Sequence, residues 1–159
     1  MAECYGSADD RFQVKLDQVA IELIAASCID AKKLETGGIL IGKYDEELRL
    51  ATIVEATPPP KGSRQGKTKF LRGTLGLKEL LDRHWENGLY YLGEWHFHPY
   101  GEALPSPQDI SQMRQLAGDQ RYHCPEPILI IAAGGPEQEF DLGVFIVPHS
   151  GDLVPLGLL

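Results

Sequence analysis

Residues 93–99 read Gly-Glu-Trp-His-Phe-His-Pro, and residues 105–109 read Pro-Ser-Pro-Gln-Asp. The first stretch predicts a strand, in which successive side chains alternate between two faces, so His96 and His98 project from the same face. The second stretch predicts the start of a helix, because proline is favoured in the first helical turn. A carboxylate at Asp109 can turn back from that turn toward the strand. The two stretches therefore predict a strand and a helix that share one site.

The residues of this shared site form a metal-ligand set. Imidazole nitrogens and carboxylate oxygens are common zinc ligands, and three protein ligands leave a fourth tetrahedral position open. An open position is typical of a catalytic zinc rather than a structural one. We therefore expect one Zn²⁺ per chain, held by His96, His98 and Asp109. Two alternate histidines that face solvent or a polar core are the plainer interpretation, which the neighbouring motifs disfavour.

The composition predicts one soluble domain over residues 1–159. The chain is 43% hydrophobic, enough for a core at this length. Fifteen Lys and Arg against 23 Asp and Glu give a net charge of −8, which disfavours nucleic acid as a partner. Three cysteines without zinc-finger spacing predict reduced thiols in the cytoplasm. The densest apolar run, 128–133, is too short to span a bilayer, so we expect no membrane insertion.

Hydrophobic periodicity predicts alternating strands and helices. We expect strands over 12–16, 37–44, 48–56, 89–98, 127–133 and 140–147, and helices over 18–33, 74–86 and 107–118. The first helix is expected to bury a stripe through Val19, Leu23 and Ala26. The last two strands are joined by 134–136, and the apolar tail 153–159 is expected to pack on the body. This order predicts an α/β sandwich with a mixed sheet.

Glu35 is the candidate general base. A metal site that hydrolyses its substrate needs a base that is not itself a ligand. This glutamate lies at the end of the first predicted helix, immediately before a strand that can neighbour the histidine strand. For a lone glutamate a solvated helix end is the usual interpretation, and only the accompanying metal motif favours a catalytic role.

A glutamate before Gly-x-Leu-x-Gly, then His-x-His-Pro, then Ser-x-x-Asp, resembles the JAMM motif of the JAB1/MPN/Mov34 metalloprotease family. The resemblance covers nearly the whole chain. It implies the MPN fold, a central curved mixed β-sheet flanked by helices and similar to that of cytidine deaminases. It also implies that His96, His98 and Asp109 are zinc ligands, that Glu35 is the general base, and that Ser106 assists the oxyanion.

The resemblance extends to a substrate class. Members of this family typically cleave isopeptide or peptide bonds at the C-terminus of ubiquitin or a ubiquitin-like modifier. Gly-Glu-Trp-His-x-His-Pro looks like the compact bacterial branch encoded beside E1- and E2-like enzymes, and most like the deconjugating protease of type II CBASS antiphage operons. In that system, the resemblance implies, an E1–E2 fusion attaches the C-terminus of a cGAS-like nucleotidyltransferase to a target amine, and the protease reverses the linkage.

Two other functions remain open. One is a processing peptidase for a ubiquitin-like sulfur-carrier precursor, because fold and metal do not define what enters the groove. The other is a non-catalytic MPN scaffold, although the chain retains every element of the motif.

Residues 61–72 carry five positive charges and no acid. A solvated loop is the default interpretation of such a segment. In this family an insertion near this position lines the substrate groove, where an extended tail can bind as an added strand. The candidate substrate-binding residues are Lys61, Arg64, Lys67 and Lys69.

Three other residues of the histidine strand divide between its two faces. Trp95 and Phe97 alternate away from the histidines and are expected in the core. Glu94 alternates onto the histidine face. It has two open interpretations, a partner that orients an imidazole and a charge on the strand surface.

Overall fold

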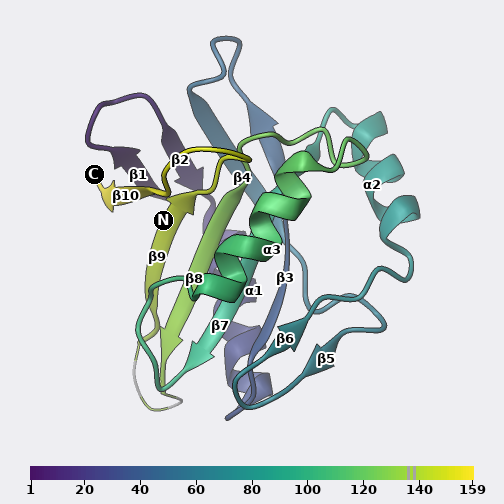
Figure 1. Cartoon of the computed structure of the whole chain (residues 1–159), viewed down its shortest axis with the longest axis vertical. Coiled ribbons are helices and arrows are strands. Elements are labelled where there is room, and N and C mark those ends of the chain that lie inside the picture. The colour runs from purple at the N-terminus through teal and green to yellow at the C-terminus, as the bar shows by residue number, and fades with distance from the viewer. Residues whose placement is uncertain (136, 138) are drawn as a thin grey trace.

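The computed structural model describes residues 1–135, 137 and 139–159 (Figure 1). Its strands are β1 (Glu3–Ser7), β2 (Gln13–Leu16), β3 (Thr36–Tyr44), β4 (Leu50–Ala56), β5 (Arg64–Gln65), β6 (Phe70–Leu71), β7 (Tyr90–Pro99), β8 (Ile128–Gly134), β9 (Asp141–Ile146) and β10 (Val154–Leu158). Its helices are α1 (Gln18–Ala31), α2 (Leu77–Glu86) and α3 (Pro107–Gly118). Within these residues no helix is long and apolar enough to cross a membrane. Pro136, at the end of the predicted 134–136 connection, lies outside the described residues.

Eight strands form one sheet that closes into a barrel in the order β1-β10-β9-β8-β7-β3-β4-β2. The sheet is mixed, as predicted, because β2 pairs in parallel with β4 and β7 with β8, while the other neighbours are antiparallel. The sheet closes into a barrel instead of forming one layer of the predicted sandwich. The closing strands are β1, which was not predicted, and β10, which forms from the apolar tail. Tyr5 of β1 pairs with Leu158 of β10. This pairing satisfies strand edges that would otherwise present open backbone groups.

The inner core lies between α1 and the sheet. Ala20, Ile24 and Cys28 are buried and belong to the same apolar cluster as side chains of β3, β4, β7 and β8. The predicted helix stripe is wrong at two of its three residues: Leu23 is partly buried and packs against this cluster, whereas Val19 is 66% exposed and Ala26 is exposed as well. The reason is that α1 carries apolar side chains on more than one face, so its periodicity does not select the face that the sheet covers.

Helix α3 covers the opposite face of the sheet, where it crosses in front of β7 and β8 (Figure 1). Met113 of α3 is fully buried and clusters with Leu129 and Ile131 of β8. Trp95 and Phe97 of β7 point into the inner core beside α1, as predicted. Strand β7 is therefore covered on both faces, and its histidines lie on the face of α3.

A bulge at Leu92, next to Gly93, determines which side chains β7 presents to that face. The register between β3 and β7 shifts at this point. Gly93 has a φ of 153°, and a Cβ atom there would lie 1.8 Å from the carbonyl oxygen of Ile128. Only glycine fits such a close backbone approach. The bulge brings Tyr91 into hydrogen-bonding reach of Glu94, three residues further along the strand.

Candidate active site

The three predicted metal ligands meet where β7 ends and α3 begins. His96 Nδ1 lies 2.9 Å from Asp109 Oδ1, and His98 Nε2 lies 3.1 Å from Asp109 Oδ2. The side chains of His96 and Asp109 are buried, whereas that of His98 is 15% exposed. Burial alone would raise the pKa of Asp109, but its hydrogen bonds with the two imidazoles outweigh this effect and hold the pKa well below its usual range. The structure therefore brings the two histidines to the ionised carboxylate of Asp109.

Asp109 also helps to start α3. The backbone N–H of Ser106 donates to Asp109 Oδ2 at 2.8 Å, and the backbone N–H of Asp109 donates to Ser106 Oγ at 3.1 Å. This capping box satisfies two backbone donors at the helix N-terminus, and Pro107 occupies the first helical position. The helix start thus fixes Asp109 in the direction of the histidines, and it holds the Ser106 hydroxyl against the backbone N–H of Asp109.

Glu35 lies half-buried in the connection between α1 and β3. Its backbone N–H donates to the carbonyl oxygen of Gly66 at 2.8 Å. Gly37, two residues further along, pairs with His96 across the β3–β7 ladder, so Glu35 directly precedes β3 near the predicted metal ligands. Burial raises the pKa of the Glu35 carboxyl, the nearby imidazoles oppose that shift, and Asp109 adds to it. The predicted base is therefore a carboxyl with a raised pKa next to the three predicted ligands.

The basic segment 61–72 contains an ordered hairpin, made by β5 and β6, that packs beside the site (Figure 1). Phe70 of β6 is only 5% exposed, and its ring meets the ring of His96 edge-on at a centroid distance of 5.7 Å. Gln65 Nε2 of β5 donates to Thr36 Oγ1 at 2.7 Å. The segment is therefore an ordered hairpin that contacts β3 and β7, while its role in binding substrate stays a prediction.

The positive charges of this segment divide into two groups. Four face solvent on the hairpin or its stem: Lys61, Arg64, Lys67 and Lys69. The fifth, Arg72, turns inward and pairs with Glu94 at 2.8 Å. Within the described part of the chain, Glu94 accepts hydrogen bonds from Arg72 and Tyr91 rather than from an imidazole. It is therefore neither a surface charge nor a direct partner of a histidine.

Sequence reasoning missed the residues by which the hairpin touches the site. Phe70 contacts His96, Gln65 contacts Thr36 of β3, and Gly66 accepts the backbone N–H of Glu35. One signal was present in the sequence, because Phe70 and Leu71 are the only large apolar residues between Lys61 and Arg72. An apolar pair in a basic segment indicates that part of the segment packs against the body.

The donor set fits a zinc ion by its chemistry. Two imidazole nitrogens and one carboxylate are ligands that zinc commonly takes in proteins. Across the described residues, however, no group of three or more His, Cys, Asp or Glu side chains has the arrangement of an assembled metal site. In the present arrangement the Asp109 oxygens are engaged in hydrogen bonds with both imidazoles. A bound cation would replace these two hydrogen bonds.

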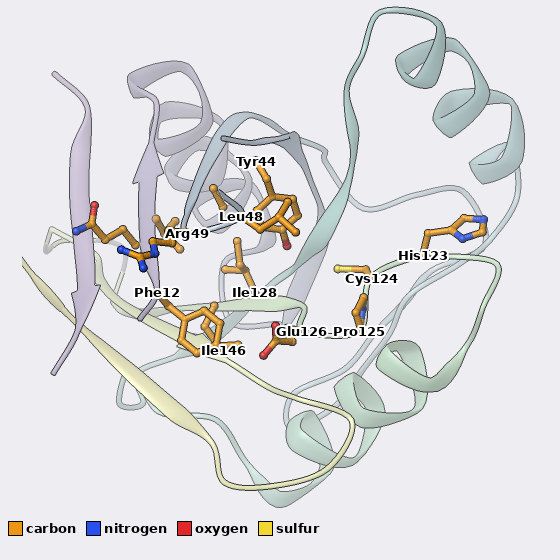
Figure 2. Close-up of a pocket in the computed structure, with 13 residues that line it drawn as sticks. Phe12, Tyr44, Leu48, Arg49, His123, Cys124, Pro125, Glu126, Ile128 and Ile146 are labelled. Atoms are coloured by element: carbon orange, nitrogen blue, oxygen red, sulfur yellow. The ribbon is translucent and has the colours of Figure 1, made fainter. Parts of the chain in front are cut away.

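A separate pocket lies at the other end of the barrel (Figure 2). Its volume is about 250 Å³. Tyr44, the last residue of β3, lines this pocket, whereas Thr36, the first residue of β3, adjoins the site. Burial raises the pKa of the Cys124 thiol in the pocket wall to about 12. Its apolar lining includes Phe12, Leu48, Ile128 and Ile146. None of the predicted site residues is part of this lining.

The fold is similar to that of a solved structure. A protein from Desulfitobacterium hafniense, determined in solution, superimposes with a TM-score of 0.64 over 91% of this chain and 88% of its own. The two sequences are 21% identical, so this likeness concerns the fold alone.

Two sequence relatives have the names of bond-cleaving enzymes. A protein of Enterobacter hormaechei subsp. hoffmannii named CD-NTase/cGAS isopeptidase is 42% identical over 146 residues, which are 92% of this chain and 81% of the relative. A probable metalloprotease of Sinorhizobium fredii is 28% identical over 130 residues, 77% of this chain and 79% of the relative. Residues 17–143 match the family described as prokaryotic homologues of the JAB domain. The chain therefore belongs to the prokaryotic JAB family.

Proposed function

We propose that this protein is a zinc-dependent isopeptidase that removes a conjugated protein modifier from its target. The observation that carries the proposal is the convergence of His96 and His98 on Asp109 beside the half-buried Glu35. The names of two relatives, CD-NTase/cGAS isopeptidases from Enterobacter hormaechei and Pseudomonas aeruginosa, support this substrate class. The probable metalloprotease from Sinorhizobium fredii supports a metal-dependent hydrolysis.

In the proposed reaction, His96, His98 and Asp109 hold one zinc ion per chain. When bound, zinc supplies a Lewis acid that lowers the pKa of water and polarises a carbonyl. Asp109 is suited to this role because it is ionised, and its position is fixed by the capping box of α3. His96 is held in place by its hydrogen bond with Asp109 and by its edge-on contact with the ring of Phe70.

Glu35 is the proposed proton carrier. Its carboxylate takes a proton from the attacking water and then gives it to the amine that leaves the scissile bond. Both halves of this task favour a pKa closer to neutral than that of a solvated glutamate, and burial shifts the pKa of Glu35 in that direction. The backbone hydrogen bond to Gly66 holds the residue in the connection that faces the ligands.

Ser106 is the proposed donor to the oxyanion. Its Oγ accepts the backbone N–H of Asp109, which orients the hydroxyl at the start of α3. The hydroxyl hydrogen is then the group that donates to the charge developing on the carbonyl oxygen. A single donor of this kind accounts for about 10²- to 10³-fold of turnover in a well-studied hydrolase.

The exposed basic side chains of the hairpin are the proposed substrate-binding residues. Lys61, Arg64, Lys67 and Lys69 are exposed, and they share a segment with Phe70, which touches His96. An extended C-terminal tail can bind there as an added strand, with backbone pairing for affinity and side-chain pockets for sequence preference. The charges favour an acidic partner surface, so raising salt should increase KM.

The proposed biological setting is antiphage defence of the type II CBASS kind. An E1–E2-like enzyme attaches the C-terminus of a cGAS-like nucleotidyltransferase to target amines, and this protein reverses the conjugation in the cytoplasm. Residues 1–159 act as a single JAB domain with the MPN fold. Nucleic acid and membranes are not proposed partners, in keeping with a net charge of −8.

The proposal is tested by comparing conjugates in the native host that carries wild-type protein or Glu35→Gln. Intact-mass and peptide mass spectrometry should detect isopeptide-linked conjugates that accumulate only with Glu35→Gln, because this variant keeps the ligands and loses the proton carrier. Glu22→Gln, an exposed glutamate of α1, is the matched control and should leave conjugate levels at those of wild type.

The alternatives predict different results in the same experiment. Equal conjugate levels in all three strains, with purified wild-type protein still holding one zinc, would contradict isopeptide cleavage and favour processing of a sulfur-carrier precursor. Equal levels together with no zinc in the purified protein would favour a non-catalytic scaffold.

A further inference from the structure

We propose that the buried Arg72–Glu94 pair positions the β5–β6 hairpin against the active site and thereby sets the rate of the chemical step. This inference rests on the proposed function and assigns a role to two residues outside the catalytic set. Neither residue touches the reacting atoms in this assignment, so both are positioning residues.

The geometry of the pair favours orientation. Arg72 Nε donates to both carboxylate oxygens of Glu94 at 3.1 and 3.2 Å, and Arg72 Nη2 donates to one of them at 2.8 Å. The guanidinium of arginine is a planar fork, so a contact of this kind fixes direction as well as distance. The side chains of Arg72 and Glu94 are 9% and 3% exposed, which removes them from competition with water.

The pair connects the hairpin to the strand that carries the histidines. Arg72 directly follows β6, and Glu94 lies two residues before His96 on β7. The hairpin in turn touches the site twice, through Phe70 against the ring of His96 and through Gly66, which accepts the backbone N–H of Glu35. Movement of the hairpin base would therefore reach both a ligand and the proposed proton carrier.

A third segment joins the same network. Arg72 Nη2 donates to the hydroxyl of Tyr122 at 2.8 Å, in the turn that follows α3, and the guanidinium lies 5.5 Å from the centre of that ring. Tyr91 donates to Glu94 at 2.7 Å, and the rings of Tyr91 and Tyr122 are 4.6 Å apart. The network thus ties the hairpin to β7 and to the end of α3, whose first turn holds Asp109.

Stability alone is a weak explanation for this pair. Taking two charges out of water is costly, and apolar residues of similar volume often replace a buried ion pair without loss of stability. A buried pair that connects three segments beside an active site is better explained by the arrangement it specifies.

The test uses the full chain with both charges removed together, because a single substitution would leave an unpaired buried charge and endanger the fold. Arg72→Met with Glu94→Met replaces the pair by apolar side chains of similar length. The matched control is Arg11→Met with Glu126→Met, which removes an exposed Arg–Glu pair. Three properties are measured: backbone amide exchange of residues 64–71, zinc content, and kcat and KM on a purified isopeptide conjugate.

In the Arg72/Glu94 variant we expect faster amide exchange over residues 64–71, unchanged zinc content, and a kcat that falls by about 10- to 10²-fold, since a small displacement of catalytic groups has effects of this size. KM should change less than kcat. The Arg11/Glu126 variant should match wild type in all three properties.

Two results would overturn the inference. Unchanged exchange of the hairpin would show that the pair does not hold it, and a raised KM with unchanged kcat would show that the hairpin only binds substrate. If wild-type protein cleaves no conjugate, the proposed function fails, whereas the exchange measurement still decides whether the pair holds the hairpin.

Discussion

The two ends of the barrel differ in what their side chains are used for. At the end where β3 begins, hydrogen bonds join polar side chains. The carboxylate of Asp109 bonds with two imidazoles and a backbone N–H. At the end where β3 finishes, a pocket of about 250 Å³ is lined mainly by apolar side chains such as Ile128 and Ile146. The polar end contains two carboxyl groups with shifted pKa values: the pKa of Glu35 is raised and that of Asp109 is lowered.

The difference teaches that the two ends are distinguished by the chemical groups they bring together. The pocket of Figure 2 has room for a small molecule, yet the titratable group buried in its wall, Cys124, is a thiol whose raised pKa keeps it protonated. The site at the other end brings together a candidate base, a candidate donor to the oxyanion and three candidate metal ligands from separate segments. Substitutions at the polar end should therefore change activity, whereas those at the apolar end should change stability.

The largest effect is expected from Asp109→Ala. It removes a proposed zinc ligand and the carboxylate of the capping box, so the protein should lose both zinc and measurable activity. Elemental analysis and a conjugate-cleavage assay would measure these losses. Asp82→Ala, at an exposed residue of α2, should retain wild-type zinc and activity.

Asp109→Asn separates the two roles of this residue. Its amide oxygen can still accept the N–H of Ser106, whereas the charge that favours a cation is gone. We expect α3 to keep its stability in this variant while zinc binding weakens. Zinc content equal to that of wild type would contradict the ligand assignment.

The second effect is expected from Ser106→Ala, which removes the proposed oxyanion donor. Turnover should fall by about 10²- to 10³-fold with zinc retained. Loss of the N-cap should also lower the free energy of unfolding by about 1 kcal/mol. Measuring kcat together with urea unfolding gives both quantities.

Ser106→Gly is the control for the cap. Glycine lacks the hydroxyl but costs a helix N-terminus only a few tenths of a kcal/mol. If Ser106 donates to the oxyanion, the glycine variant should be as slow as the alanine variant. Recovery of kcat in the glycine variant would mean that Ser106 acts only through the helix start.

The polar end was more predictable from sequence than the barrel around it. His-x-His on a strand and a Ser-Pro helix start each carry a local geometric rule, and α3 begins at Pro107 as predicted. Glu35 could be identified as the candidate base only from the motif as a whole, because a lone glutamate has no spacing that identifies it. The structure places all five residues of the motif in one region, whereas their catalytic roles remain proposals.

Features that depend on distant partners were not predictable. Strand β1 has only two buried residues, Tyr5 and Ser7, and it exists as a strand because β2 and β10 flank it. The buried stripe of α1 was misplaced because the sheet, rather than the helix periodicity, selects the covered face. The partner of Glu94 is Arg72, 22 residues away, and no local pattern indicates that pairing.

The third effect is a loss of stability, expected from a substitution at the apolar end. Ile128 is 1% exposed and lines the pocket, so Ile128→Val should lower the free energy of unfolding by about 0.5–1.5 kcal/mol. Its kcat and zinc content should equal those of wild type. A fall in kcat without a fall in stability would connect the two ends of the barrel and break the contrast between them.

The smallest effect is expected from treating the native protein with iodoacetamide, which should modify few of its cysteines. Cys4 is exposed, whereas burial raises the pKa of both Cys28 and Cys124 to about 12. A raised pKa leaves less thiolate at about pH 7.5, and thiolate is the form that iodoacetamide alkylates. Peptide mass spectrometry should therefore find the label on Cys4 alone in the native protein and on all three cysteines after unfolding. Rapid native labelling of Cys124 would mean that its thiol is accessible and reactive, so that the apolar end is not the unreactive region that its raised pKa indicates.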